Sequence, residues 1–320
     1  MPDSKPRIGV VMDPIEAITP YKDSTLAMML EVQRRGWELR YLTLGDLWLD
    51  NGEAVGEHHA VEVFDDSADW YRLGTAETGP LGALDAILMR KDPPFDMEYI
   101  YATYILERAE AAGAEIINRP ASLRDVSEKV YTAWFPECCP PTRIDRSPAR
   151  LRRVIRELGR AVLKPLDGMG GREIYVVNDG DPNTSVILDH LTEGGSRFAL
   201  AQAYLPEIRD GDRRILLIDG EPVPHALARI PAAGETRGNL AAGGRGVGVD
   251  LSERDYGLCR RIGPVMREKG LRFVGLDVIG DYVTEINVTS PTCIRELDAL
   301  YDINIAARLM DAIAAGRGWS

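Results

Sequence analysis

The sequence predicts an α/β protein in which an N-terminal open parallel sheet is followed by two further lobes. Three observations lead to this prediction. In the first part of the chain, apolar β-branched runs alternate with helical stretches, as they do in parallel sheets. Further on, a glycine-rich loop joins two β-prone runs at 161–177, and an apolar hairpin at 273–286 carries acidic side chains.

The N-terminal part opens with a strand–helix–strand unit. Residues 7–12 form an apolar run typical of a buried parallel strand. We expect Ser24 to cap a helix that continues to about Arg35, and residues 37–44 to form the next strand.

The same alternation continues to residue 124, where we place the end of a first domain, 1–124. Its further predicted elements are a meander at 47–64, a strand at 85–89, a helix at 96–112 and a strand at 115–117. Together they predict an open, Rossmann-like sheet with helices on both faces.

Two cations, Arg90 and Lys91, directly follow the strand predicted at 85–89. Open α/β sheets bind ligands at the carboxyl ends of their strands, so this pair is a candidate ligand site. The alternative is an ordinary polar loop that the neighbouring prolines keep rigid.

The composition limits the classes of function. The chain has 38 Lys and Arg against 50 Asp and Glu, a formal net charge of −12, which argues against nucleic acid as a partner. It contains no apolar run of about 20 residues, so we expect no transmembrane helix and no membrane partner. The N-terminus lacks the apolar stretch of a secretory signal.

The cysteines and histidines indicate neither disulfides nor a metal site. The four cysteines form no CxxC pair, and a reduced, cytoplasmic protein is the simplest account. His58 and His59 are adjacent on a predicted strand and would face opposite ways, which makes a poor chelate. We expect both histidines to be exposed to solvent.

A second unit is predicted at 125–201. Residues 122–135 should form an amphipathic helix that begins at Ser122 and carries Lys129. An arginine-rich helix with a solvated face is expected at 149–158.

The glycine-rich loop lies at the centre of this unit. Lys164 precedes it, and Gly168, Gly170 and Gly171 lie within it. Glycines let backbone N–H groups approach an anion, and the lysine adds a mobile positive charge for phosphate. The loop joins two strands and matches neither common phosphate-loop motif, so it predicts a flap over a nucleotide. The alternative is a plain glycine-rich hairpin with a surface lysine.

A third unit, 202–320, follows a weakly charged strand at 198–205. The backbone of this strand could pair with the edge of a purine. Two strands joined by a turn at Asp219-Gly220 come next. The loop at 231–249 contains Arg237 and Arg245, and we expect it to be a lid over an anionic substrate rather than a passive surface loop.

The last part of the chain predicts a metal site. After a helix at 253–269, the hairpin carries Asp277 on one arm and Glu285 and Asn287 on the other. Carboxylate and amide oxygens on one hairpin face suit Mg²⁺, which also takes phosphate oxygens. A closing helix is expected from Ile294 to about residue 315.

Several longer motifs, in the same order along nearly the whole chain, closely resemble the bacterial glutathione synthetases of the ATP-grasp superfamily. They are Met12-Asp13-Pro14, Lys164-Pro-Leu-Asp-Gly-Met-Gly-Gly171, and the segments 89–95, 101–108, 234–245 and 285–296. One departure is Arg172-Glu173 after the glycines, where family members carry small residues.

The resemblance implies a fold and a reaction. The fold would be the N-terminal sheet domain followed by a two-lobed ATP-grasp domain. The reaction would join γ-glutamylcysteine to glycine through an acyl phosphate, with release of ADP and phosphate. It further implies ATP as a substrate, two Mg²⁺ ions for which Mn²⁺ can substitute, a cytoplasmic location and a homotetramer.

The resemblance also implies roles for individual residues. ATP would be held by Lys129, Lys164, Gly168, Gly170, Gly171, Gln202, Ala203, Tyr204, Leu205 and Asp212. The metal ligands would be Asp277, Glu285 and Asn287. The phosphate in transfer would be stabilised by Arg214 and Arg229, with Arg237 from the lid. The other substrates would contact Arg90, Lys91, Arg237, Thr289, Ser290 and Pro291.

Three alternatives differ in the chemistry that they predict. Another ATP-grasp ligase, such as a peptide or D-alanine ligase, would share ATP and Mg²⁺ but use another amine acceptor. A non-catalytic ATP-binding regulator would lack the metal ligands or the lid. A nucleotide-binding dehydrogenase would need a GxGxxG after the first strand, which is absent.

Overall fold

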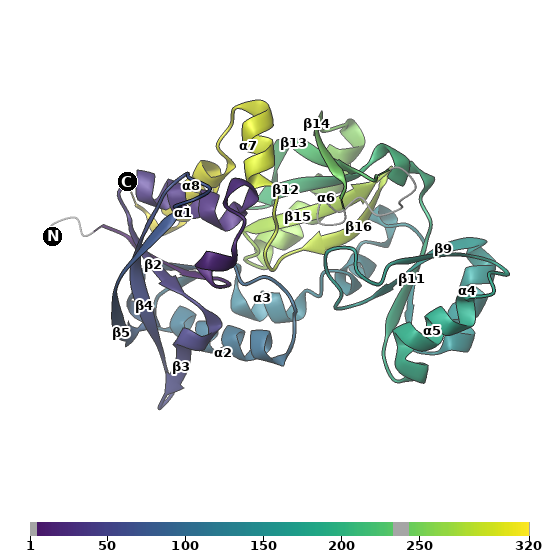
Figure 1. Cartoon of the computed structure of the whole chain (residues 1–320), viewed down its shortest axis with the longest axis horizontal. Coiled ribbons are helices and arrows are strands. Elements are labelled where there is room, and N and C mark those ends of the chain that lie inside the picture. The colour runs from purple at the N-terminus through teal and green to yellow at the C-terminus, as the bar shows by residue number, and fades with distance from the viewer. Residues whose placement is uncertain (1–4, 233–242, 320) are drawn as a thin grey trace.

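The computed structural model describes residues 5–232 and 243–319. It contains three sheets, which lie side by side along the longest axis of the molecule (Figure 1). The N-terminal sheet lies at one end, the sheet around the glycine loop at the other, and the C-terminal sheet between them. Within the described residues, no helix has the length and apolar character needed to cross a membrane.

The N-terminal sheet has seven strands, in the order β3-β4-β2-β1-β6-β7 with β5 paired to β4. The parallel strands are β1 (Arg7–Val11), β2 (Glu38–Leu42), β6 (Ala86–Met89) and β7 (Glu115–Ile117). The antiparallel ones are β3 (Leu47–Asp50), β4 (Glu53–Val63) and β5 (Tyr71–Pro80). The sheet is therefore mixed: the predicted parallel strands β2, β1, β6 and β7 are neighbours, and the predicted meander at 47–64 forms antiparallel strands on one side.

Helices pack on both faces of this sheet, as predicted. Ile8 and Val10 of β1 belong to one apolar core together with α1 (Ser24–Arg34). Val11 faces the other core, which contains Tyr99 and Leu106 of α2 (Met97–Ala111). This follows from the period of two residues along a strand.

Three local predictions in this region need correction. Asp23, not Ser24, caps α1, because its Oδ1 accepts a hydrogen bond from the Leu26 amide at 2.6 Å. His58 is buried at 6% exposure, because it lies on the same face of β4 as the buried Ala54 and Gly56. The helix predicted at 122–135 is broken into α3 (Pro120–Asp125) and a 3₁₀ helix at Val130–Trp134.

The second sheet has four antiparallel strands in the order β10-β9-β11-β8. They are β8 (Thr142–Asp145), β9 (Arg160–Pro165), β10 (Tyr175–Asn178) and β11 (Ala199–Ala203). Helices α4 (Pro148–Leu158) and α5 (Thr184–Thr192) cover one face, where Ala161 and Leu163 are buried. The alternate residues Val162 and Lys164 therefore face the other way, toward the middle of the molecule.

The third sheet has five antiparallel strands in the order β14-β13-β12-β15-β16. They are β12 (Asp212–Ile218), β13 (Glu221–Ile230), β14 (Arg245–Asp250), β15 (Phe273–Ile279) and β16 (Tyr282–Asn287), with α6 (Glu253–Glu268) packed against β13. Arg245 and its neighbours thus belong to a strand, not to a loop. The remainder of the predicted lid, including Arg237, lies outside the described residues.

The predicted closing helix is two helices, α7 (Ile294–Tyr301) and α8 (Ile305–Arg317). The break falls at Asp302, which has a φ of 51°, and Asn304 caps α8 through the Ala307 amide at 2.8 Å. Helix α8 returns to the N-terminal unit, where Arg35 on α1 pairs with Asp311 at 2.7 Å. The C-terminal residues therefore complete the first core as well as the third unit.

Candidate active site

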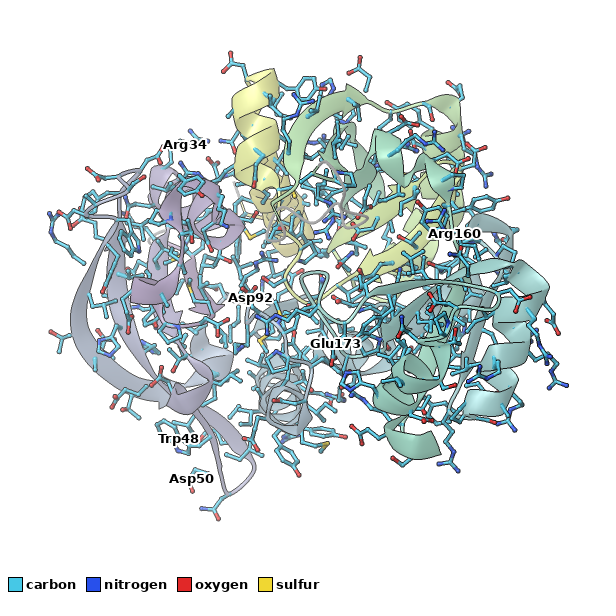
Figure 2. The ribbon with its side chains drawn as sticks, turned by 45° about the vertical axis from the view of Figure 1, so that its right-hand side comes forward. Arg34, Trp48, Asp50, Asp92, Arg160 and Glu173 are labelled. Atoms are coloured by element: carbon cyan, nitrogen blue, oxygen red, sulfur yellow. The ribbon has the colours of Figure 1, made fainter. Side chains whose placement is uncertain are left out.

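A cavity of about 480 Å³ lies between the three units, and each of them contributes to its walls. The N-terminal unit contributes Asp13 and Asp92, the second unit the glycine loop, and the third unit the β15–β16 hairpin. In Figure 2 the labelled Asp92, on the N-terminal unit, and Glu173, on the glycine loop, mark two of the segments around this central region. The sequence motifs that are far apart along the chain thus meet in one place.

The glycine loop covers the cavity from β9 to β10, as predicted for a flap. Gly170 and Gly171 have φ values of 63° and 79°, which favour glycine. Gly168 is needed for another reason, because a Cβ there would lie 2.7 Å from Cγ of Pro165. All three glycines line the cavity.

One part of the cavity is apolar. Val162, Ile174 and Val176 line it from the second unit, and Ile208 and Ile279 line it from the third. Two facing apolar walls suit a flat aromatic ring such as a purine.

The hinge strand presents fewer free backbone donors than the sequence suggests. The amide of Ala203 donates to Pro141 O at 2.9 Å, and the amide of Tyr204 donates to Arg160 O at 3.2 Å. Among the described residues no acceptor takes the Leu205 amide, so this N–H remains for a ligand. The Gln202 side chain accepts from Lys164 Nζ at 3.3 Å and donates to Thr142.

Two lysines reach the cavity in different electrostatic states. Lys129 lies between α3 and the 3₁₀ helix, and its Nζ contacts Glu285 Oε1 at 2.9 Å and Gly168 O at 2.6 Å. Burial disfavours its charge, but Glu285 more than offsets this and raises the pKa of Lys129. Lys164 has no carboxylate within 4 Å in the described chain, and burial lowers its pKa.

A network of arginines and carboxylates forms the floor of the cavity. Arg214 Nε and Nη2 donate to the two oxygens of Asp277 at 2.5 and 3.0 Å, and Arg229 Nη2 contacts the same carboxylate at 2.9 Å. These two guanidinium groups outweigh burial and hold the pKa of Asp277 well below its usual range. The carboxylate therefore stays ionised and keeps both arginines in place.

Asp212 completes this network from the start of β12. Its Oδ2 accepts a hydrogen bond from Arg229, whereas its Oδ1 is buried without a partner. Burial raises the pKa of Asp212 to about 6, even though Arg229 opposes the shift. A buried oxygen that lacks a donor is a natural acceptor for a ligand hydroxyl.

The hairpin residues fit a divalent cation. Asp277 and Glu285 are direct partners across β15 and β16, and Asn287 lies two residues further on β16. The Asn287 side-chain amide donates to Gly275 O at 3.1 Å, which leaves its Oδ1 as an acceptor. Carboxylate and amide oxygens on one wall are the donor set that Mg²⁺ prefers.

Some of the predicted site residues do not line the cavity. Arg90 is buried away from it, where Nε donates to Thr25 Oγ1 at 3.1 Å and Nη2 to Pro291 O at 2.8 Å. Lys91 pairs with Asp13 at 2.9 Å and is not part of the cavity wall, and neither is Pro291. Arg90 and Lys91 therefore do not line the cavity, because tertiary contacts within the protein use both charges, and their contact with a substrate stays a prediction. Thr289 and Ser290 do line the cavity.

Sequence reasoning missed several charged residues of the wall, among them Lys22, Glu128 and Glu296. Glu128 Oε1 accepts from the amides of Val288 and Thr289 at 2.9 and 3.0 Å and so fixes the segment after Asn287. Nothing in the local sequence around these residues marks them, because the other segments of the cavity wall lie far away along the chain.

Comparisons with known proteins identify the family of the chain. The chain matches the models of the prokaryotic glutathione synthetase N-terminal domain, at residues 7–124, and of the prokaryotic glutathione synthetase ATP-grasp domain, at residues 128–302. A glutathione synthetase from Pseudomonas aeruginosa (strain PAO1) is 58% identical over 309 residues, which cover 97% of this chain and 98% of the relative. One from Vibrio vulnificus (strain YJ016) is 56% identical over 307 residues, with 96% of each chain covered.

Solved structures with low sequence identity share the fold. A D-cycloserine synthetase has a TM-score of 0.68 at 15% identity, with 97% of this chain and 99% of that chain covered. An ATP-grasp ligase solved with a minimal precursor, Mg and ADP has a TM-score of 0.62 at 15% identity, with 97% and 98% covered. The predicted fold class is confirmed.

Proposed function

Since the chain belongs to the prokaryotic glutathione synthetase family, and is thus an ADP-forming ATP-grasp ligase that makes glutathione, we propose how its cavity performs the reaction. The carboxylate of γ-glutamylcysteine attacks the γ-phosphate of ATP, and ADP leaves. The amine of glycine then attacks the acyl phosphate, an amide bond forms, and phosphate leaves. A carboxylate needs this activation because its oxygen is otherwise a poor leaving group.

ATP binds with its purine between the two apolar walls. The Leu205 amide is the backbone donor that remains for the purine edge, and the unpartnered Asp212 Oδ1 accepts a ribose hydroxyl. Lys164 and Lys129 bind the phosphates, and the glycine loop covers them. Burial lowers the pKa of Lys164 in the free protein, which supports this role because an anion would supply the missing countercharge.

Arg214 and Arg229 stabilise the phosphate in transfer. Their fixed positions on Asp277 mean that little reorganisation is needed when negative charge develops, which is the general requirement for electrostatic catalysis. Arg237, which lies outside the described residues, is proposed to add to this charge from the lid.

Asp277, Glu285 and Asn287 would hold two Mg²⁺ ions, for which Mn²⁺ can substitute. When bound, the metal neutralises phosphate charge and aligns the γ-phosphate. Thr289 and Ser290 belong to the segment that Glu128 fixes, and we assign to them the placement of glycine.

The observation that carries this proposal is the meeting of the flap, two lysines, two arginines and the acidic hairpin around one cavity. Purified protein with ATP and Mg²⁺ should release phosphate only when γ-glutamylcysteine and glycine are both present, with one glutathione formed per phosphate. Equal release with another acid–amine pair would move the substrate assignment. No turnover with any pair would contradict the ligase mechanism.

We further propose that the enzyme works in the cytoplasm as a homotetramer. The four cysteines are free and buried, which supports a reducing compartment. The exposed side chains of Met97, Tyr101 and Tyr104 form an apolar stripe on α2, which supports contact between subunits. Light scattering of the purified protein tests the subunit number, and a monomeric mass would contradict it.

A further inference from the structure

One end of the cavity carries charged side chains that have no role in the reaction proposed above. It lies where the start of α1 meets the start of α7, and the Ile294 amide joins the two by donating to Ser24 Oγ at 3.1 Å. Lys22 lines the cavity from the residue before the α1 cap, and Glu296 lines it from the first turn of α7.

Glu296 has a carboxylate oxygen that lacks a donor. Its Oε2 is buried and has no hydrogen-bond partner in the described structure. Burial raises the pKa of Glu296 above its usual value, although the charge of Lys22 acts against the shift. A buried polar atom without a partner is costly in a folded protein, and a ligand that donates a hydrogen bond removes that cost.

Lys22 provides the opposite charge without pairing to Glu296. The two side chains influence each other electrostatically, but within the described residues Lys22 Nζ has no carboxylate within 4 Å. Two opposite charges that share a cavity wall and do not contact each other leave room for a ligand group that itself carries both charges.

Two of the other carboxylates at this end are already used, and the third, Asp92, is exposed to solvent. Asp13 pairs with Lys91 at 2.9 Å and accepts from the Asp92 amide. Asp23 caps α1 through the Leu26 amide. Glu296 is therefore the carboxylate at this end that has a buried oxygen without a donor among the described residues.

We propose that Glu296 and Lys22 bind the amino-acid head of the γ-glutamyl group, with Glu296 holding the α-ammonium and Lys22 the α-carboxylate. This inference rests on the proposed function, because it concerns the acid substrate of that reaction. In this proposal Glu296 and Lys22 take the substrate-binding role that the sequence suggested for Arg90 and Lys91, whose charges have partners within the protein. The pair selects acids that carry both an α-amino and an α-carboxylate group.

Two substrate analogues test the two halves of this pair separately. N-glutarylcysteine lacks the α-ammonium, and N-(4-aminobutanoyl)cysteine lacks the α-carboxylate. The unmodified enzyme should favour γ-glutamylcysteine over each by about 10- to 100-fold in kcat/KM, the range of one charge-assisted hydrogen bond. Glu296→Gln should lose the preference against N-glutarylcysteine alone, and Lys22→Gln the preference against N-(4-aminobutanoyl)cysteine alone.

Glu16→Gln is the matched control. Glu16 is exposed and lies next to the cavity-lining Ala17, so the control removes the same charge near the same rim. It should keep both preferences. Each preference is a ratio measured on one protein preparation, so a partly unfolded variant still gives a valid ratio.

The possible outcomes separate this inference from the proposed function. If the unmodified enzyme uses γ-glutamylcysteine but Glu296→Gln and Lys22→Gln keep both preferences, the assignment of the pair is overturned. If the variants lose the same preference to the same extent, separate recognition of the two charges is overturned. If the unmodified enzyme does not use γ-glutamylcysteine at all, the proposed function itself fails.

Discussion

Arg214 and Asp277 face each other on neighbouring strands and form a two-point ion pair, Nε to Oδ1 at 2.5 Å and Nη2 to Oδ2 at 3.0 Å. Both side chains are almost completely buried. Arg229 reaches the same carboxylate at 2.9 Å, so a single aspartate places two cations at the floor of the cavity.

Replacing this aspartate should damage both stability and catalysis. Asp277→Asn leaves two buried guanidinium groups short of negative charge, and breaking a buried pair typically costs about 3–5 kcal/mol. We expect a clear loss in the free energy of unfolding, measured with urea, and no detectable turnover. Asp281→Asn, in the exposed turn of the same hairpin, should change neither. A fully stable Asp277→Asn protein would contradict the role given to this pair.

Asp212 should give stability a recognisable dependence on pH. Its pKa is about 6 in the folded protein, against about 3.9 in an unfolded chain. Between these values the folded state binds more protons, so this group makes the protein less stable as the pH rises from about 4 to 6. The effect is at most about 2–3 kcal/mol. Asp212→Asn should flatten that part of a plot of unfolding free energy against pH, and an unchanged slope would contradict the raised pKa.

Lys164 should affect ATP binding and stability in opposite directions. Its charge is buried without a carboxylate partner among the described residues, so Lys164→Met removes an unfavourable charge from the free protein. We expect an equal or higher melting temperature without ligand, and ATP affinity lowered by about 10- to 100-fold in calorimetry. Lys91 pairs with Asp13 but does not itself line the cavity. Lys91→Met should therefore leave ATP affinity unchanged. Normal ATP binding by Lys164→Met would remove Lys164 from the site.

Glu285→Gln should raise the Mg²⁺ concentration needed for half-maximal activity. The change keeps the size of the side chain but removes one of the two carboxylates in the proposed donor set, and Mg²⁺ binds carboxylates more strongly than amides. It also removes the partner of Lys129, so the ATP affinity should be measured alongside. An unchanged metal dependence would exclude Glu285 as a ligand.

The sequence could predict those parts of the site that are local in the chain. The flap depends on glycines within a few residues, and the acidic hairpin on the period of two along a strand. Lys22 and Glu296 could not be predicted in this way, because only the packing of α7 against the start of α1 brings them into one cavity wall.

The wrong predictions about local structure have similar causes. Ser24 is a good cap by type, but its Oγ accepts from the distant Ile294 amide, and Asp23 takes the capping position. The helix predicted at 122–135 is interrupted, since Glu128 binds the amides of Val288 and Thr289 instead of continuing a helical pattern. In each case a long-range hydrogen bond overrides a correct local preference.

The most direct test of the central claim follows an oxygen atom through the reaction. γ-Glutamylcysteine labelled with ¹⁸O in its cysteinyl carboxylate is incubated with the enzyme, ATP, Mg²⁺ and glycine, and the released phosphate is examined by mass spectrometry. If the carboxylate attacks the γ-phosphate, each phosphate released should carry one ¹⁸O atom from the substrate. Glutathione formed together with unlabelled phosphate would contradict the acyl-phosphate mechanism.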